Sequence, residues 1–319
     1  MSAMDRGATS VPPPGAIGVS PPGAPVAPLE PPSRLRAALI VARFSLRESL
    51  RRRVFVVIAL LTLVFLSLYG LATWQAFKAS EDFAAGMETG VDADIVVGAT
   101  MAGLAMFATL FLGTILAVFL TLGAVRGDAE RGLLQPLLVR PLPRHTLLFG
   151  RWLGATAVCA PYVVLIALAS FALTRALGGW WPDRLVGPLL GLALGVAIIA
   201  ALSLAGSIVL ASTANGIAVF MLFGAGLTAG LLGQIAEAIG SDGLGEIADV
   251  ASWALPFEAL YQAGLAEITI DTVGFARLAI DLGPFGGAQS AGASLWLWSL
   301  GYLAAVGAAA VAAFARRDL

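Results

Sequence analysis

The sequence predicts an all-α, polytopic membrane protein with six transmembrane helices, and two observations lead to this fold class. The first is composition. Of the 319 residues, 59% are hydrophobic and 12% are charged, and the mean hydropathy is +0.89, whereas about a quarter of the residues in a soluble domain are charged. The second is segment length, because several uncharged stretches reach the ~20 residues that a helix needs to cross a ~30 Å hydrocarbon core.

The first 33 residues have a different character from the rest. Residues 1–33 are rich in Pro, Gly, Ala and Ser, and they lack the apolar core of about 7–15 residues that a signal peptide contains. Proline opposes regular helix, and the segment has little apolar surface to bury. We therefore expect a disordered, Pro-rich cytoplasmic tail, with a proline-rich partner-binding motif as the alternative.

Residues 34–53 predict an amphipathic helix that lies in the membrane interface. Leucine and alanine recur at helical spacing along one stripe, and arginines follow an adjacent stripe. Such a helix places its arginines toward anionic lipid head groups. These arginines are Arg36, Arg43, Arg47 and Arg51. The alternative, a basic flank of the first span, requires only the cluster at 51–53.

The six spans are expected within residues 54–319. In chain order they cover residues 54–74, 95–125, 152–173, 185–211, 216–235 and 295–315. Only the sequence STAN at 212–215 separates the fourth span from the fifth, which predicts a tight polar turn there. In the fifth span, Gly226 and Gly230 form a GxxxG pair, a spacing that permits close helix packing.

The distribution of basic residues predicts the orientation. Of the 19 Lys and Arg residues, 15 precede the first span, lie between the second and third, or follow the sixth, and 4 lie in the other connections. Basic residues remain on the cytoplasmic side of multi-pass proteins. We therefore expect a cell inner or plasma membrane protein with both termini and the loop 126–151 in the cytoplasm.

The extracytoplasmic segment 236–292 is the longest predicted connection, and it is acidic. Pro256 after a tryptophan, followed by Leu260 and Tyr261, predicts short helices. These helices lie either on the outer membrane surface, with Trp253 and Tyr261 in the interface, or in a buried or lipid-facing structural position.

Several kinds of chemistry lack their residues in this chain. The sole lysine is Lys78, so the phosphate-binding motif GxxxxGK[ST] does not occur. One His and one Cys cannot make a metal-ligand cluster. The second, fourth, fifth and sixth predicted spans contain no Asp, Glu, Lys or Arg, which disfavours an ion-coupled secondary transporter. We expect no catalytic site, no cofactor and no nucleic acid partner. Any transport path would suit a lipid-like or amphipathic cargo, or it would form only in an oligomer.

A pattern in the loop 126–151 resembles a known family. The residues fit the spacing E-x-G-x-L-x-x-L-L-x-x-P-x-x-R-x-x-x-x-x-G-[KR], which is similar to the cytoplasmic loop between spans two and three of ABC transporter permeases of the type 2 exporter class. The matching residues are Glu130, Gly132, Leu134, Leu137, Leu138, Pro141, Arg144, Gly150 and Arg151. The basic interfacial helix, the six spans and the run from Pro256 to Tyr261 also resemble this class.

The resemblance implies that the loop contains a coupling helix that docks on a separate cytoplasmic ATP-binding cassette ATPase, which would hold ATP and Mg. It also implies a second permease subunit, in a homodimer or a heterodimer. An acidic start favours such a helix through its dipole, but Pro136 falls inside it and should kink or shorten it. The alternative for the loop is an ordinary basic connection. The alternatives for the chain are a non-transporting scaffold or assembly factor and a secondary transporter.

Overall fold

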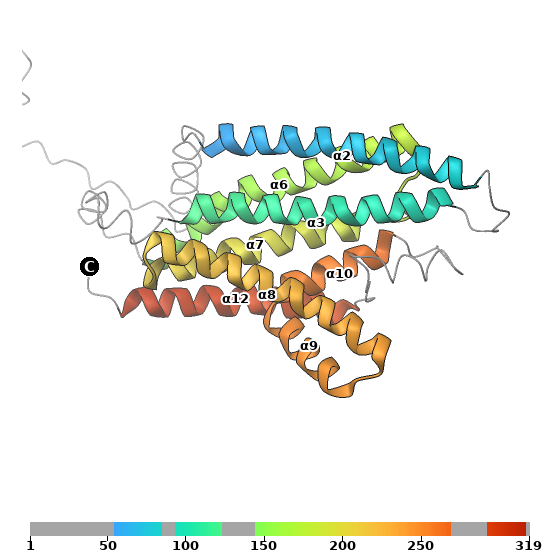
Figure 1. Ribbon diagram of the computed structural model, residues 1–319. Coiled ribbons are helices and arrows are strands. Elements are labelled where there is room, and N and C mark those ends of the chain that lie inside the picture. The colour runs from blue at the N-terminus through green and yellow to red at the C-terminus, as the bar shows by residue number, and fades with distance from the viewer. Residues whose placement is uncertain (1–53, 85–92, 123–143, 269–291, 317–319) are drawn as a thin grey trace, which may run out of the picture. The chain divides into compact units, whose positions relative to one another are not determined.

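The computed structural model describes residues 54–84, 93–122, 144–268 and 292–316, and within these ranges the chain forms eight α-helices and no strand (Figure 1). Six helices are long and apolar enough to cross a membrane, which confirms the predicted all-α, six-span fold class. They are α2 (Val54–Ala84), α3 (Ala93–Thr121), α6 (Arg144–Gly178), α7 (Val186–Val209), α8 (Ser212–Ile239) and α12 (Ala293–Ala315). Two shorter helices, α9 (Asp242–Ala254) and α10 (Pro256–Ile268), connect α8 to α12.

The spanning helices begin and end at two opposite ends of the bundle. We call the end where α6 begins the proximal end and the opposite end the distal end. At the proximal end, Leu148 near the start of α6 packs with Ile208 at the end of α7 and Phe314 at the end of α12. At the distal end, Ser80 of α2 donates a hydrogen bond to the Asp94 carboxylate at the start of α3, with Oγ and Oδ1 3.0 Å apart.

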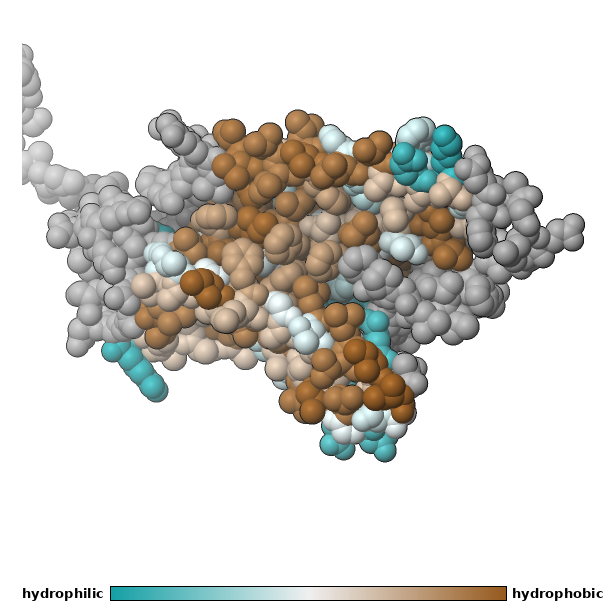
Figure 2. All heavy atoms as spheres, viewed as in Figure 1, coloured by the Kyte–Doolittle hydropathy of each residue, from teal (hydrophilic) through white to brown (hydrophobic). Residues whose placement is uncertain are grey.

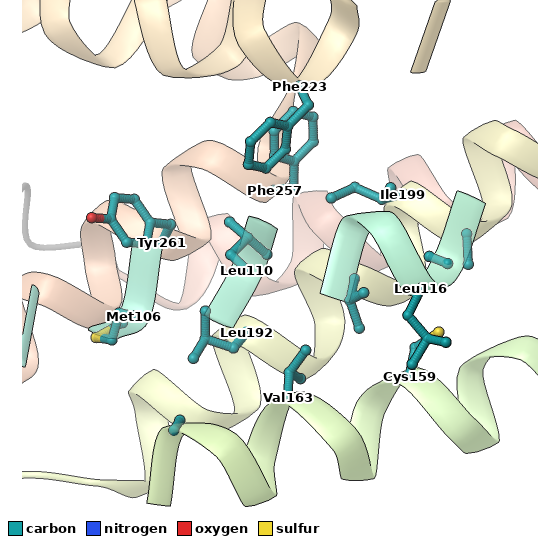
Figure 3. Packing of buried hydrophobic residues seen from close by; sticks show 14 of the residues in the cluster. Met106, Leu110, Leu116, Cys159, Val163, Leu192, Ile199, Phe223, Phe257 and Tyr261 are labelled. Carbon is teal, nitrogen blue, oxygen red and sulfur yellow. The ribbon is translucent and has the colours of Figure 1, made fainter. Parts of the chain in front are cut away.

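The core lies where α3, α6 and α7 meet (Figure 3). Met106, Leu110 and Leu116 of α3 belong to one buried cluster with Val163 of α6 and Leu192 of α7. Dispersion between closely packed apolar side chains holds helices together in a bilayer, where lipid already satisfies the hydrophobic effect. The core therefore depends on close packing of these three helices.

Helix α2 lies at the periphery and faces outward along most of its length. Hydrophobic side chains cover α2 and also α9 (Figure 2), and Val56, Leu63 and Leu68 of α2 are each more than 60% exposed. Lipid tails would cover such a surface in a membrane. On its inward side, the Tyr69 hydroxyl lies 2.6 Å from the Thr174 hydroxyl of α6, so a buried hydrogen bond fixes α2 on the bundle.

The structure corrects the predicted turn at 212–215. Helix α8 already begins at Ser212, and the break between α7 and α8 is limited to Leu210 and Ala211. Asn215 lies in the first turn of α8 and is fully buried. Its Nδ2 donates to the backbone oxygen of Ser203, 2.9 Å away. The asparagine is therefore a buried polar contact between two helices and not part of a turn.

The structure also moves the start of the third spanning helix. The predicted span began at Trp152, whereas α6 begins at Arg144. The sequence predicts residues 144–151 as part of the loop, and they contain three basic side chains, His145 included. They form instead the first two turns of α6, because an α-helix can continue past the edge of the apolar layer.

Of the two placements open for residues 253–265, the surface placement is wrong for α10 and the buried one is confirmed. Tyr261 is 3% exposed, and almost every residue of α10 is buried. Helix α10 packs most extensively on α7 and also contacts α3, α8 and α12. Helix α9 differs, because Trp253 near its end is 56% exposed.

Candidate functional site

The start of α6 is anchored to two other helices at the proximal end. Leu148 is 4% exposed and packs in a cluster with Leu204 and Ile208 of α7 and with Ala310 and Phe314 of α12. The adjacent Phe149 is 46% exposed, so only one face of this helix start is buried. A displacement of the chain just before α6 would therefore act directly on α7 and α12.

A hydrogen bond reinforces this anchor one turn further on. Trp152 Nε1 donates to the backbone oxygen of Ala197 in α7 at 3.0 Å. The Trp152 ring also lies 5.7 Å from the Phe149 ring, measured between centroids. Because an indole N–H in an apolar bundle must find an acceptor, this contact fixes the rotation of α6 relative to α7.

A polar cluster ties three helices together near the same end. The Thr121 hydroxyl of α3 donates to Ser203 Oγ of α7 at 2.6 Å. Asn215 of α8 donates to the backbone oxygen of the same serine, and it packs against Gly206 of α7. All three polar side chains are at most 1% exposed. Hydrogen bonds of this kind fix the register of α3, α7 and α8 in an environment without water.

Helix α10 packs closely against two glycine pairs, one on α7 and one on α8. On α7, Gly191 and Gly195 approach the backbone oxygens of Leu260 and Phe257, which would lie 3.1 and 3.6 Å from a Cβ carbon added at each glycine. On α8, Gly226 and Gly230 face Phe257 and Glu258. The predicted close packing at the GxxxG pair of α8 is thus confirmed, and its partner is the short helix α10.

The Phe257 ring of α10 packs against α8. It stacks on the Phe223 ring of α8, with centroids 6.0 Å apart and planes 10° apart (Figure 3). On the other side of α10, the Tyr261 hydroxyl reaches the backbone oxygen of Gly103 in α3 at 3.4 Å. The helix is therefore fixed from three directions.

Glu258 is a buried acidic residue of α10, 3% exposed. Gln262, one turn later, donates to its carboxylate, with Nε2 and Oε1 2.7 Å apart. Burial raises the pKa of Glu258 to about 7, and the hydrogen bond from Gln262 opposes that shift in part. A carboxyl group that is half neutral near pH 7 is chemically distinct from the exposed acids of the same segment.

The structure describes only part of the predicted coupling site. Gly150 is buried in α6, Arg151 is half-buried, and Arg144 is the first residue of that helix. The other six matched residues, Glu130 to Pro141, lie outside the described residues, as do Pro136 and the arginines of the predicted interfacial helix. Among the described residues, no group of three His, Cys, Asp or Glu side chains could hold a metal ion.

The sequence alone does not single out Glu258, because nothing near it distinguishes this residue from the other acids of the connection 236–292. The signal that points to it is a combination: Glu258 and Gln262 share one helix face at i, i+4, and the glycine pair of α8 leaves room for one further helix.

The comparison with protein families decides what kind of protein carries this arrangement. The family model described as ABC-2 family transporter protein matches residues 39–319, which include all eight described helices. The chain belongs to the ABC-2 transporter family. A comparison with curated proteins finds no match.

Membership of the ABC-2 family confirms the resemblance drawn from the loop 126–151. The chain is an ABC transporter permease of the ABC-2 type, and its six apolar helices make it a multi-pass membrane protein. Membership of this family also implies association with an ATP-binding cassette ATPase. The start of α6, which contains the last three matched residues, is therefore the first candidate site in the described structure.

Proposed function

We propose that this chain is the membrane-spanning subunit of an ATP-driven exporter and that it couples ATP hydrolysis by a separate cytoplasmic ATPase to substrate movement. The chain itself is not an enzyme in this proposal: the partner ATPase binds ATP and Mg, and two permease subunits, identical or different, form the membrane part. The part of the loop that precedes α6, residues 126–143, docks on the ATPase. The proximal end faces the cytoplasm, in agreement with the distribution of basic residues.

The observation that carries the proposal is the anchor at the start of α6. The loop that resembles a coupling segment leads directly into α6, and Leu148 lies four residues after Arg144 in contact with α7 and α12. Packed helices transmit displacement because their interiors are nearly incompressible. Closure of the ATPase subunits would pull the loop, tilt α6, and shift the proximal ends of α7 and α12 with it.

The first test addresses docking. Leu134→Asp places a charge in the apolar part of the proposed coupling helix, and Glu130→Ala removes an acid from its first turn. We expect both variants to insert normally and to lose transport in proteoliposomes that contain the partner ATPase, while the ATPase continues to hydrolyse ATP. Normal ATPase binding together with normal transport in both variants would refute the coupling assignment.

The second test addresses transmission through α6. Leu148→Ala removes a buried side chain from the anchor, and Leu165→Ala makes the same truncation at a position of α6 that is 66% exposed. A buried leucine truncation costs about 2–5 kcal/mol of local packing. We expect Leu148→Ala to bind the ATPase but to transport less substrate per ATP hydrolysed, and Leu165→Ala to behave like the wild type. Equal ratios of transport to ATP hydrolysis in the two variants would show that the Leu148 contacts do not transmit movement from α6 to α7 and α12.

A further inference from the structure

A cavity of about 270 Å³ lies between α8, α9, α10 and α12. Glu258 and Gln262 of α10 line it together with Asp249 of α9, and the Trp253 and Trp298 rings form part of its wall. The two tryptophans are held in place, because Trp298 Nε1 donates to the backbone oxygen of Trp253 at 3.0 Å and the ring centroids are 5.1 Å apart. The cavity is thus a formed site with two carboxylates and an aromatic side.

The cavity contains acceptors without a matching cation. No Lys, Arg or His is among the described residues that line it. The Glu258 carboxylate receives a hydrogen bond from Gln262, whereas Gln262 Oε1 is buried and has no hydrogen-bond partner among the described residues. A buried carboxylate without a cationic partner is costly, and so is a buried oxygen without a donor. A ligand with positive charge and several hydrogen-bond donors would compensate both.

The lining favours an organic cation over a metal ion. Calcium requires about 6–8 oxygen ligands, and the described residues hold no cluster of three acidic or imidazole side chains. Tryptophan rings attract organic ammonium groups through their π faces. An ammonium group carries N–H donors for the Glu258 carboxylate and for Gln262 Oε1. The cavity is slightly smaller than the ~300 Å³ of the smallest typical ligand pockets, so it fits a head group better than a whole lipid.

Apolar side chains are exposed on α9 and α12, two of the helices that form the cavity. On α9, Ile247, Val250 and Trp253 are 59%, 70% and 56% exposed, and on α12 Leu297 is 71% exposed. Figure 2 shows hydrophobic side chains over α9 and the adjoining end of α8. A ligand with its charged end in the cavity would therefore have a surface for an apolar tail.

We propose that this cavity binds the ammonium head group of an amphiphile, between the Glu258 carboxylate and Gln262, with its tail along the exposed faces of α9 and α12. The ligand is either an aminophospholipid of the bilayer or a free amphiphilic amine. This binding site goes beyond the proposed coupling function and needs no ATPase, so its test and the coupling test can fail separately.

The test measures binding of dodecylammonium to the purified full-length chain in a neutral detergent by isothermal titration calorimetry. Glu258→Gln preserves shape and removes the charge, while Glu267→Gln makes the same change on α10 outside the cavity lining. Loss of a charge-assisted hydrogen bond costs about 1.5–3 kcal/mol, equivalent to about tenfold or more in affinity. We expect this loss of affinity in Glu258→Gln only. At about pH 5, where the wild-type Glu258 carboxyl is protonated, both variants should keep the thermal unfolding midpoint of the wild type.

The pH dependence provides an independent check. A proton and an ammonium group compete for Glu258, so the affinity of the wild type should fall below about pH 7, and that of Glu258→Gln should not. The other titratable groups near Glu258 are Asp249, which lines the same cavity, and Tyr261, whose pKa burial raises far above this range. Among the cavity-lining residues, α8 and α12 contribute no titratable side chain.

Two further titrations identify the ligand. If the natural ligand is the lipid, nanodiscs of phosphatidylethanolamine should weaken the apparent affinity for dodecylammonium relative to phosphatidylcholine nanodiscs; equal affinities indicate a free amine. The proposal is overturned if binding does not saturate, if Glu258→Gln binds as well as the wild type, or if Glu267→Gln is equally impaired. Tighter binding of dodecylguanidinium would overturn the assignment of an ammonium group.

Discussion

Replacing Gly113 with leucine should strongly destabilise the helix bundle, whereas the same replacement at Gly70 should be tolerated. Gly113 lies in α3 where it crosses α6 and α7, and an added Cβ would collide with Val163 Cγ1 and lie 3.2 Å from Val196 Cγ2. Both valines are completely buried, so neither can move aside. A Cβ at Gly70 in α2 meets nothing within 4 Å.

Overpacking of a well-packed core costs about 1–3 kcal/mol and occasionally more, and here a whole leucine must fit between three helices. The Gly70→Leu variant should even be slightly more stable than the wild type, because leucine favours a helix over glycine by somewhat less than about 1 kcal/mol. Thermal unfolding in detergent, followed by tryptophan fluorescence, measures the difference. Equal unfolding midpoints in the two variants would show that the crossing at Gly113 is looser than its contacts indicate.

The six spans could be predicted from the sequence because the bilayer imposes a simple rule on length and polarity. Each apolar stretch of sufficient length became a helix, and the GxxxG spacing at Gly226 correctly indicated a close contact. The helix ends were less accurate. Polarity marks where the hydrocarbon ends and not where a helix begins, so the arginines before Trp152 predict a loop although α6 already begins at Arg144.

The position of α10 could not be derived from the sequence, because it depends on other helices. Its 13 residues would extend about 20 Å, too short for a span, and nothing in PFEALYQAGL specifies burial on all sides. That burial arises from the glycines of α7 and α8, which are separated from it in the chain. The carboxylate of Glu258 became a buried group only through this packing. The coupling residues from Glu130 to Pro141, which the sequence did indicate, remain a prediction.

The stability of the fold should fall as the pH rises, and Glu258 should be the main cause. Burial raises the pKa of its carboxyl from 4.5 to about 7, with partial opposition from the Gln262 hydrogen bond. The folded chain therefore holds this proton more tightly than the unfolded chain. The corresponding stability is fully present below about pH 4.5 and is lost as the pH rises through about 7. A shift of this size corresponds to about 3 kcal/mol.

Glu258→Gln separates this contribution from every other titration. Glutamine has the shape of the protonated glutamic acid and stays neutral, so the variant should match the wild type at about pH 5 and exceed its unfolding midpoint at about pH 8. Glu267→Gln should retain the wild-type decline, because Glu267 is only half-buried and does not line the cavity. If the wild type and Glu258→Gln lose stability equally between these pH values, other groups cause the decline. Glu258 would then be charged in the folded chain, which requires a cation or water beside it in the cavity.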